Sequence, residues 1–261
     1  MKTKQRIGLI IGLIVFLIGV ALGLAFNFRV VLSVIEGMSF WGNSEALSYD
    51  PWLETDAIIT TVKCPILLTP TESKEIRIRV KNTKDFEIKP WVQISVSDPA
   101  QEENINRNKQ ELVLAPGETK EISWMLTPEN IIENRIILVR FFLFRSKYHP
   151  PSITRHCGVF IPDVGNLKGS QILSLTIGLS LAFMLAGMWL WWKSSTFQMR
   201  RMPRMINRMI WLCLFWVANV IAILLEWQPA SIALLILTVL LVMTIFENIM
   251  MESIFRPENP T

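Results

Sequence analysis

Four apolar runs and one alternating segment organise this chain. Ile7 to Phe26 carries no charge over twenty positions. At about 1.5 Å per residue, a helix of that length crosses a hydrocarbon core of roughly 30 Å. Three further apolar runs lie at 172–192, 209–225 and 230–246. Because apolar and polar positions alternate between the first and second runs, we expect four transmembrane α-helices, one before and three after an all-β ectodomain.

Three of these spans allow another interpretation. The first follows the basic segment 1–6 and ends at a tolerable cleavage site, Gly23-Leu-Ala25, so a cleaved signal peptide is the alternative to a retained span. The last two runs are short and joined only by residues 226–229, which predicts a tight helical hairpin. A re-entrant hairpin is the alternative there.

Basic residues near the spans predict the orientation. Lys and Arg concentrate on the cytoplasmic side of membrane proteins. They occur here before the first span and between the second and third, at Lys2, Lys4, Arg6, Lys193, Arg200, Arg201, Arg204 and Arg208. We therefore expect a multi-pass protein of the cytoplasmic membrane with both termini inside and the ectodomain outside. We also expect Arg200, Arg201, Arg204 and Arg208 to face anionic lipid headgroups, and Pro203 to begin the third spanning helix.

The expected organisation has seven parts. They are a transmembrane helix at 1–28, an extracytoplasmic linker at 29–56, a β-sandwich at 57–163, a second span at 164–193, a basic loop at 194–208, a helical hairpin at 209–247 and a cytoplasmic tail at 248–261.

The net charge of +4 does not indicate nucleic-acid binding. Residues 58–163 hold fifteen Lys and Arg against thirteen Asp and Glu. The ectodomain therefore lacks the strong basic excess that phosphate binding requires. With 51% hydrophobic residues, the chain is also too apolar for an ordinary soluble domain.

The alternating segment predicts seven short strands. Ile76, Ile78 and Val80 share one face, and the same alternation recurs at 92–96 and 122–126. Further strands are expected at 58–63, 110–114, 136–145 and 153–161. Seven strands in about a hundred residues are typical of an immunoglobulin-like sandwich of two sheets.

Two stretches carry a family resemblance. Ser73-Lys-Glu-Ile-Arg-Ile-Arg-Val-Lys-Asn82 and Leu114-Ala-Pro-Gly-Glu-Thr-Lys-Glu-Ile-Ser-Trp-Met-Leu126 resemble bacterial surface immunoglobulin-like domains in which a Pro-Gly-Glu turn leads into the fifth strand. The Gly-x-Tyr that often opens the next strand of such domains is absent at Glu133-Asn-Arg-Ile136. The resemblance covers the ectodomain alone and implies a fold and a display role, with no activity.

The phase of the strands also predicts a disulfide. Cys64 shares the phase of Val62, and Cys157 shares that of Val159, so both thiols should point inward. The first and last strands of such sandwiches can lie side by side. We therefore predict a Cys64–Cys157 disulfide outside the cytoplasm. Cys213 lies in a span and is expected to be a buried free thiol.

Rows of small residues predict close helix packing. The first span has Gly8, Gly12, Gly19 and Gly23; the second has Ser174, Gly178, Ala182 and Ala186. Such rows let helix backbones approach closely in lipid, within one chain or between subunits. The alternative is that Gly and Ala are simply frequent in membrane helices.

The sixth strand suggests a partner surface. Residues 136–145 are apolar on both faces. If Ile137, Val139, Phe141 and Leu143 face the core, then Leu138, Phe142 and Phe144 join Trp91 on an outer surface suited to a partner. A covering segment from residues 29–57, or a register that buries the other phase, are the alternatives.

Candidate chemistry is sparse. His149, and His156 beside Cys157, suggest a soft-metal site, but neighbouring strand residues point to opposite faces. No catalytic set or cofactor motif is recognisable, and Asn219 is the one strongly polar residue well inside a predicted span. We therefore expect no enzyme activity, no metal and no cofactor. The four methionines between 199 and 209 suggest interfacial burial more than Cu(I) binding.

Together these patterns predict a non-catalytic accessory or scaffold subunit of a membrane complex, with other integral membrane subunits as partners. The alternative is a stand-alone envelope sensor or adhesion protein that binds an external ligand. An enzyme or transporter with an unrecognised site is a third class.

Overall fold

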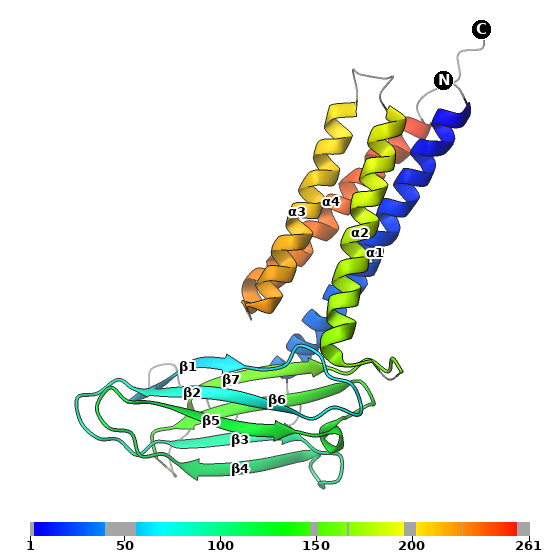
Figure 1. Cartoon of the computed structure of the whole chain (residues 1–261). Helices are drawn as coiled ribbons and strands as arrows, with labels where there is room; N and C mark the ends of the chain where they lie inside the picture. The colour runs from blue at the N-terminus through cyan, green and yellow to red at the C-terminus, as the bar shows by residue number, and fades with distance from the viewer. Residues whose placement is uncertain are drawn as a thin grey trace. The chain divides into compact units, whose positions relative to one another are not determined.

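The fold is given by a computed structural model of the whole chain (Figure 1). The structure describes residues 3–39, 56–146, 151–165, 167–195, 202–225 and 227–254. The chain divides into two compact units, one formed by residues 1–28 with 173–261 and one by residues 29–172.

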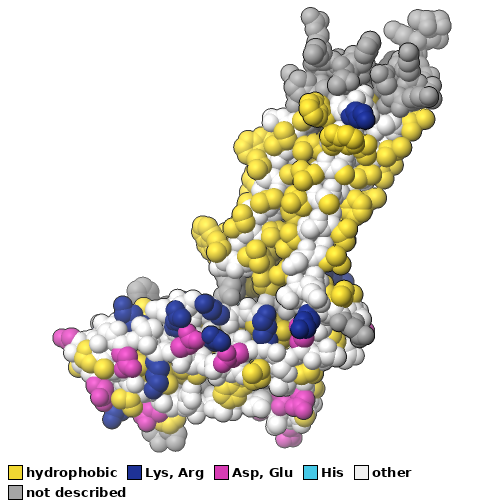
Figure 2. Space-filling view, viewed as in Figure 1, with side chains coloured by type: hydrophobic (Ala, Val, Ile, Leu, Met, Phe, Trp, Pro, Cys, Tyr) yellow, Lys and Arg dark blue, Asp and Glu magenta, His cyan; other side chains and the backbone are white. Residues whose placement is uncertain are grey.

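Four α-helices occur in the described residues. They are α1 (Thr3–Ser39), α2 (Gly169–Ser195), α3 (Met202–Leu224) and α4 (Gln228–Ile254). Three of these contain stretches long and apolar enough to cross a membrane, and α4 contributes a shorter apolar stretch, Pro229–Ile245. Hydrophobic side chains cover the visible face of these helices (Figure 2). The molecule thus combines helices suited to a membrane with a β-sandwich.

Helix boundaries differ from the expected ones in three places. Helix α1 continues to Ser39, so residues 29–39 are helical where a linker was expected. Helix α3 begins at Met202, with Pro203 in its first turn as predicted, inside the expected basic loop. Helix α4 runs to Ile254 and takes up half of the expected tail. Each helix thus extends past its apolar run, α1 and α4 at the C-terminal end and α3 at the N-terminal end, because polar residues can continue a helix.

Seven strands in the described part of the chain form the sandwich. They are β1 (Ala57–Lys63), β2 (Lys74–Asn82), β3 (Trp91–Ser97), β4 (Ile105–Glu111), β5 (Thr119–Leu126), β6 (Ile136–Phe144) and β7 (Pro151–Phe160). One sheet has the order β1-β2-β5 and the other β4-β3-β6-β7, and all neighbouring strands are antiparallel (Figure 1).

The core lies between the two sheets, on the faces that the alternation predicted. Ile76, Ile78 and Val80 of β2 face the inward residues of β3 and β6. On β6 the phase is also as predicted, with Ile137, Val139, Phe141 and Leu143 in the core. Burial of two alternating faces is what holds such a two-layer domain together.

The Pro-Gly-Glu segment forms the expected turn into β5. Gly117 has a φ of +70°, which suits the third position of a type II turn after proline. The Glu118 amide donates to the Ala115 carbonyl, and the Glu118 carboxylate accepts from the Ala115 amide at 2.7 Å. The turn therefore closes on itself before the strand begins.

The fourth strand lies earlier than expected. The alternation at 110–114 suggested a strand there, but β4 occupies 105–111 and has mostly polar, exposed residues. Leu112 and Leu114 are buried after the strand ends, and Leu114 bridges to Ile88. β4 is an edge strand and has no apolar face of its own. Its main-chain hydrogen bonds to β3 hold it in the sheet.

Candidate functional site

The outer face of β6 is buried, which corrects the expectation of an open partner surface. Leu138, Phe142 and Phe144 lie opposite the core phase, as expected, but their exposed fractions are 5%, 0% and 4%. Trp91 lies beside Phe144 and is half-buried. These side chains are therefore enclosed within the chain itself.

The end of α1 provides part of that cover. Residues 29–39 belong to the same compact unit as the sandwich. The carbonyl oxygen of Ser33 lies against Gly158 on the outer face of β7, so closely that a side chain at Gly158 would collide with it. A Cβ at Gly37 would lie 2.9 Å from the Cys157 carbonyl carbon. Helix and strand thus meet at glycines on both sides.

Two arginines extend this contact. The Arg140 Nη2 atom donates to the Met38 carbonyl at 2.6 Å, and Arg140 is only 3% exposed. Burial lowers the pKa of Arg140. Arg135 pairs with Glu36 of α1 at 2.8 Å and with Glu133, and hydrogen bonds to these carboxylates raise its pKa. The end of α1 is therefore fixed on the sandwich by packing and by charge.

The start of α2 is also held by the sandwich. The Glu72 carboxylate accepts from the Gly169 amide at 2.7 Å and from the Thr69 amide at 3.0 Å. Burial would raise the pKa of Glu72, but the hydrogen bonds from Gly169 and Thr69 outweigh it and lower the pKa. A carboxylate at a helix N-terminus also interacts favourably with the helix dipole.

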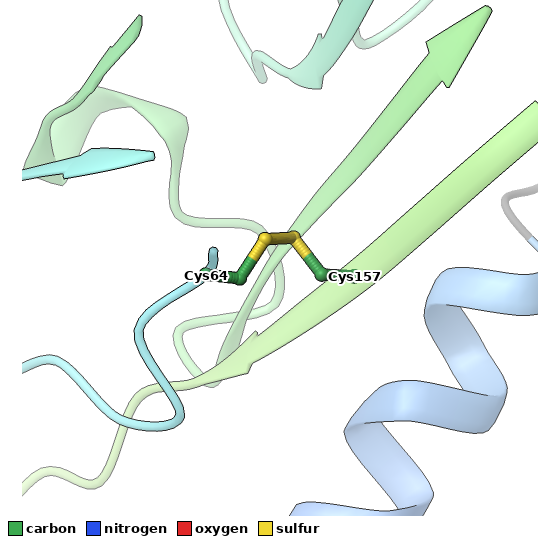
Figure 3. Close-up of a disulfide and its surroundings, with 2 residues drawn as sticks. All are labelled: Cys64 and Cys157. Atoms are coloured by element: carbon green, nitrogen blue, oxygen red, sulfur yellow. A yellow bond between two sulfur atoms is a disulfide. The ribbon is translucent and has the colours of Figure 1, made fainter. Parts of the chain in front are cut away.

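The predicted disulfide is present. Cys64, directly after β1, is bonded to Cys157 of β7 (Figure 3). It connects the two sheets where Leu67 and Phe160 form a parallel bridge. Because it closes a loop with a sequence separation of 93 residues, the disulfide is expected to stabilise the folded state by about 4.6 kcal/mol in the chain-entropy account.

The glycine row of α1 lies in the interior of the helical unit. A Cβ at Gly12 would come within 2.8 Å of the Trp191 amide nitrogen, and one at Gly19 within 2.7 Å of the Ser180 carbonyl. Gly8 approaches Ser194, and Gly23 approaches both Ser180 and Trp216. Ser180 also donates to the Gly19 carbonyl at 2.7 Å. This row of glycines therefore lets α1 pack closely against its neighbouring helices.

The small row of α2 lies on a different face. Ser174, Gly178, Ala182 and Ala186 are all exposed. A Cβ at Gly178 would meet nothing within 4 Å. The face that α2 turns to α1 instead contains Ser180, Met184 and Gly187. The predicted row thus exists, and in the described chain no helix packs on it.

Sequence reasoning missed a second buried amide in the helices. Asn27 and Asn219 are 1% and 0% exposed, and neither side chain has a hydrogen-bond partner in the described part of the chain. Asn219 was noticed because it interrupts an apolar run. Asn27 was overlooked because the first run ends at Phe26, and only the continuation of α1 places it inside a helix.

The predicted lipid-binding arginines lie mostly beyond what can be described. Arg200 and Arg201 fall outside the described residues, as does His149. Arg204 lies in the first turn of α3, and the Arg208 side chain is half-buried. Their role with anionic headgroups stays a prediction.

A groove of about 540 Å³ lies at one end of the sandwich. It is lined by residues from the start of β1, the β2–β3 loop and the end of β6. Asp56 pairs there with Arg145 at 2.9 Å, and Phe86 is 55% exposed. Buried Asn82 holds the loop by donating to the Phe86 carbonyl at 2.8 Å.

The described residues bring together no group of three or more metal-ligating side chains. His156 and Cys157 follow one another on β7 and so point to opposite faces, with Cys157 in the disulfide.

Comparisons with known proteins leave the family open. No family model matches the sequence, and no curated protein matches it. Solved structures with local likeness include β-glucosidases from Erythrobacter marinus (16% identity, TM-score 0.30, 41% of this chain and 15% of that one) and Listeria innocua (19%, 0.30, 43% and 17%). A CARDB domain from Pyrococcus furiosus, in complex with di-metal ions, has 14% identity and a TM-score of 0.32 over 44% of this chain and 98% of that domain. The chain thus spans less than a fifth of either glucosidase, and scores this low support no functional conclusion.

Proposed function

We propose that this protein is a non-catalytic accessory or scaffold subunit of a multi-subunit membrane complex. In this proposal four helices cross the cytoplasmic membrane with both termini inside, and an immunoglobulin-like sandwich is displayed outside. The partners are other integral membrane subunits, with anionic lipid headgroups at the basic loop. The strand grouping supports the immunoglobulin-like description, although β4 pairs with β3 rather than joining the sheet of β1, β2 and β5.

The observation that carries the proposal is the contrast between two small-residue rows. The α1 row is occupied within the chain, whereas the α2 row is exposed and Gly178 meets nothing within 4 Å. In lipid, close backbone packing supplies much of helix association, and a row of this kind is suited to another helix. The sandwich holds the end of α1 at Gly158 and the start of α2 at Glu72, which supports a display role.

Purification under mild conditions tests the proposal. The tagged full-length protein is extracted from its native membrane and the bound proteins are identified by native gel and mass spectrometry. We expect stoichiometric membrane partners with the wild type and with Gly178→Ala, which keeps the position small. Gly178→Leu should remain folded and lose the partners. Recovery of the wild type alone would refute the subunit role.

A sensor or adhesion role is the second candidate, and the groove beside Phe86 is the observation that favours it. A groove of this size with an exposed aromatic ring and an ion pair between half-exposed Arg145 and Asp56 resembles ligand sites in general form. In that case the protein purifies alone, and an external ligand protects the β2–β3 loop from hydrogen exchange.

A further inference from the structure

Polar atoms from three helices converge inside the helical unit. At Gly23 of α1, a Cβ would lie 2.6 Å from the Ser180 hydroxyl of α2 and against the indole Nε1 of Trp216 of α3. Ser180 and Trp216 are 0% and 2% exposed, and the Trp216 Nε1 has no hydrogen-bond partner in the described residues. A donor that is buried without a partner loses its hydration and gains nothing in return.

The buried side-chain amides of Asn27 and Asn219 lie next to this group of polar atoms. Asn27 lies one helical turn beyond Gly23, and Asn219 lies one turn beyond Trp216. Because α1 and α3 run in the same direction within the unit (Figure 1), both amides lie on the same side of the Gly23 contact. We call Asn27, Ser180, Trp216 and Asn219 the polar cluster.

The cluster carries more hydrogen-bonding capacity than its own members use. Each amide offers two N–H donors and one oxygen acceptor, and Trp216 offers one donor. All of these atoms in Asn27, Asn219 and Trp216 are unpartnered within the described chain. In an apolar environment each such group costs several kcal/mol unless a partner is supplied. A native bundle is therefore expected to hold a ligand at this position.

The chemistry of the cluster indicates which ligand. Its members are neutral, and they include both donors and acceptors. An ion would lack a compensating charge from the cluster, whereas water can accept from the amide and indole N–H groups and donate to the amide oxygens. Asn27 lies at the end of the first apolar run, at 7–26, so water has a short path from the adjacent aqueous phase.

We propose that the polar cluster is a hydrated binding site in which ordered water connects α1, α2 and α3. The site is independent of the partner-binding row on α2, whose residues lie on another face of that helix. A dry alternative exists, in which Asn27 and Asn219 bond directly to each other or to helix carbonyls, and the experiment separates the two.

Thiol reactivity measures hydration at each position. Asn27→Cys, Asn219→Cys and Leu212→Cys are prepared in the full-length protein with Cys213→Ala, leaving the Cys64–Cys157 disulfide intact. Leu212 is the matched dry control, since it is 1% exposed on the same helix and belongs to an apolar cluster. Each protein in lipid nanodiscs is treated with 2-aminoethyl methanethiosulfonate, a small water-soluble reagent, and modification is followed by intact mass.

We expect cysteines at 27 and 219 to react at least tenfold faster than the one at 212, because a thiol must be hydrated to ionise and react. Rates equal to that of the control at both positions would overturn the proposal and favour the dry alternative. If the variants do not fold, ¹⁵N-tryptophan labelling of the native protein decides. The Trp216 indole signal, assigned by its loss in Trp216→Phe, should show an exchange peak with water, and its absence would refute the site.

Discussion

The helices α1 and α2 carry nearly the same small-residue pattern and use it differently. In α1, each glycine of the row lies against a neighbouring helix, and the helix end then packs on the sandwich through Gly37. In α2, the row at Ser174, Gly178, Ala182 and Ala186 is exposed. Four-residue spacing therefore indicates that a face permits close approach, and the tertiary fold determines whether the same chain occupies it.

The largest effect is expected where α1 meets the sandwich. In Gly158→Ala, the new methyl group would occupy the position of the Ser33 carbonyl oxygen, and neither backbone can move without undocking the helix end. We expect a loss of about 3 kcal/mol in the free energy of unfolding, at the upper end of overpacking effects. Chemical denaturation of the purified protein measures it. Hydrogen exchange at residues 29–39 should rise at the same time, and unchanged protection there would contradict the docked arrangement.

A smaller effect is expected inside the helical unit. Gly12→Val places a branched side chain within 3.0 Å of both the Trp191 amide and the Gly187 carbonyl, which separates α1 from α2. We expect the unfolding free energy to fall by about 2 kcal/mol. Thermal unfolding in detergent, followed by circular dichroism, measures the change. A variant as stable as the wild type would show that the α1 row does not hold the bundle.

The pattern of apolar residues predicted the strands well and the end of α1 poorly. Alternation predicted seven strands, six of them near their observed positions, because a strand buried on one side leaves a period of two. The phases of the first and last strands also gave the disulfide. A covering segment from residues 29–57 was one of the alternatives, but alternation gave no sign that residues 29–39 would continue α1 as a helix. A sign was available in Val30, Val34 and Gly37, which lie at helical spacing beyond the first apolar run. Phe142 and Phe144 are buried, so the surface that they suggested is not open.

Long-range polar contacts were beyond prediction for another reason. Glu72 and Gly169 are separated by 97 residues, as Glu36 and Arg135 are by 99. The residues around a surface carboxylate do not indicate which distant group it will bind. Only the folded chain brings the carboxylate and its partner together. The small-residue row of α2 differs from these contacts because its pattern was visible in the sequence. Under the proposed function, the helix that packs on it belongs to another subunit.

The cap on α2 should contribute an intermediate effect that depends on pH. Glu72→Ala removes the acceptor for the Gly169 amide and is expected to cost about 1 kcal/mol at neutral pH. Because the folded pKa of Glu72 lies below its ordinary value of 4.5, its stabilisation is complete above that value and is lost as the pH falls through the folded pKa. The difference between wild type and variant should therefore shrink below about pH 4.5 in denaturation experiments. A constant difference would argue against the capping role.

The ion pair between Arg135 and Glu36 should matter less. Arg135 is 41% exposed and is shared with Glu133, so solvent and a second partner reduce the loss. A double-mutant cycle with Arg135→Gln and Glu36→Gln is expected to give a coupling energy of about 0.5 kcal/mol. A value near zero would leave docking to the glycine contacts and the hydrogen bond from Arg140 to the Met38 carbonyl.

The smallest effect on folding is expected at Gly178, where the comparison between the two helices is most direct. A leucine there meets nothing within 4 Å in the chain, whereas the branched side chain at Gly12 collides with backbone on two sides. Gly178→Leu in the isolated protein should therefore change the unfolding free energy by less than about 0.5 kcal/mol, as at other exposed positions. Thermal unfolding of Gly178→Leu beside Gly12→Val measures both helices on one scale. If Gly178→Leu proved as destabilising as Gly12→Val, the α2 row would be occupied within the chain and would offer no face to a partner. A stable Gly178→Leu that also loses its membrane partners would instead assign the row to contacts between subunits, because the side chain would then act only where another helix is present.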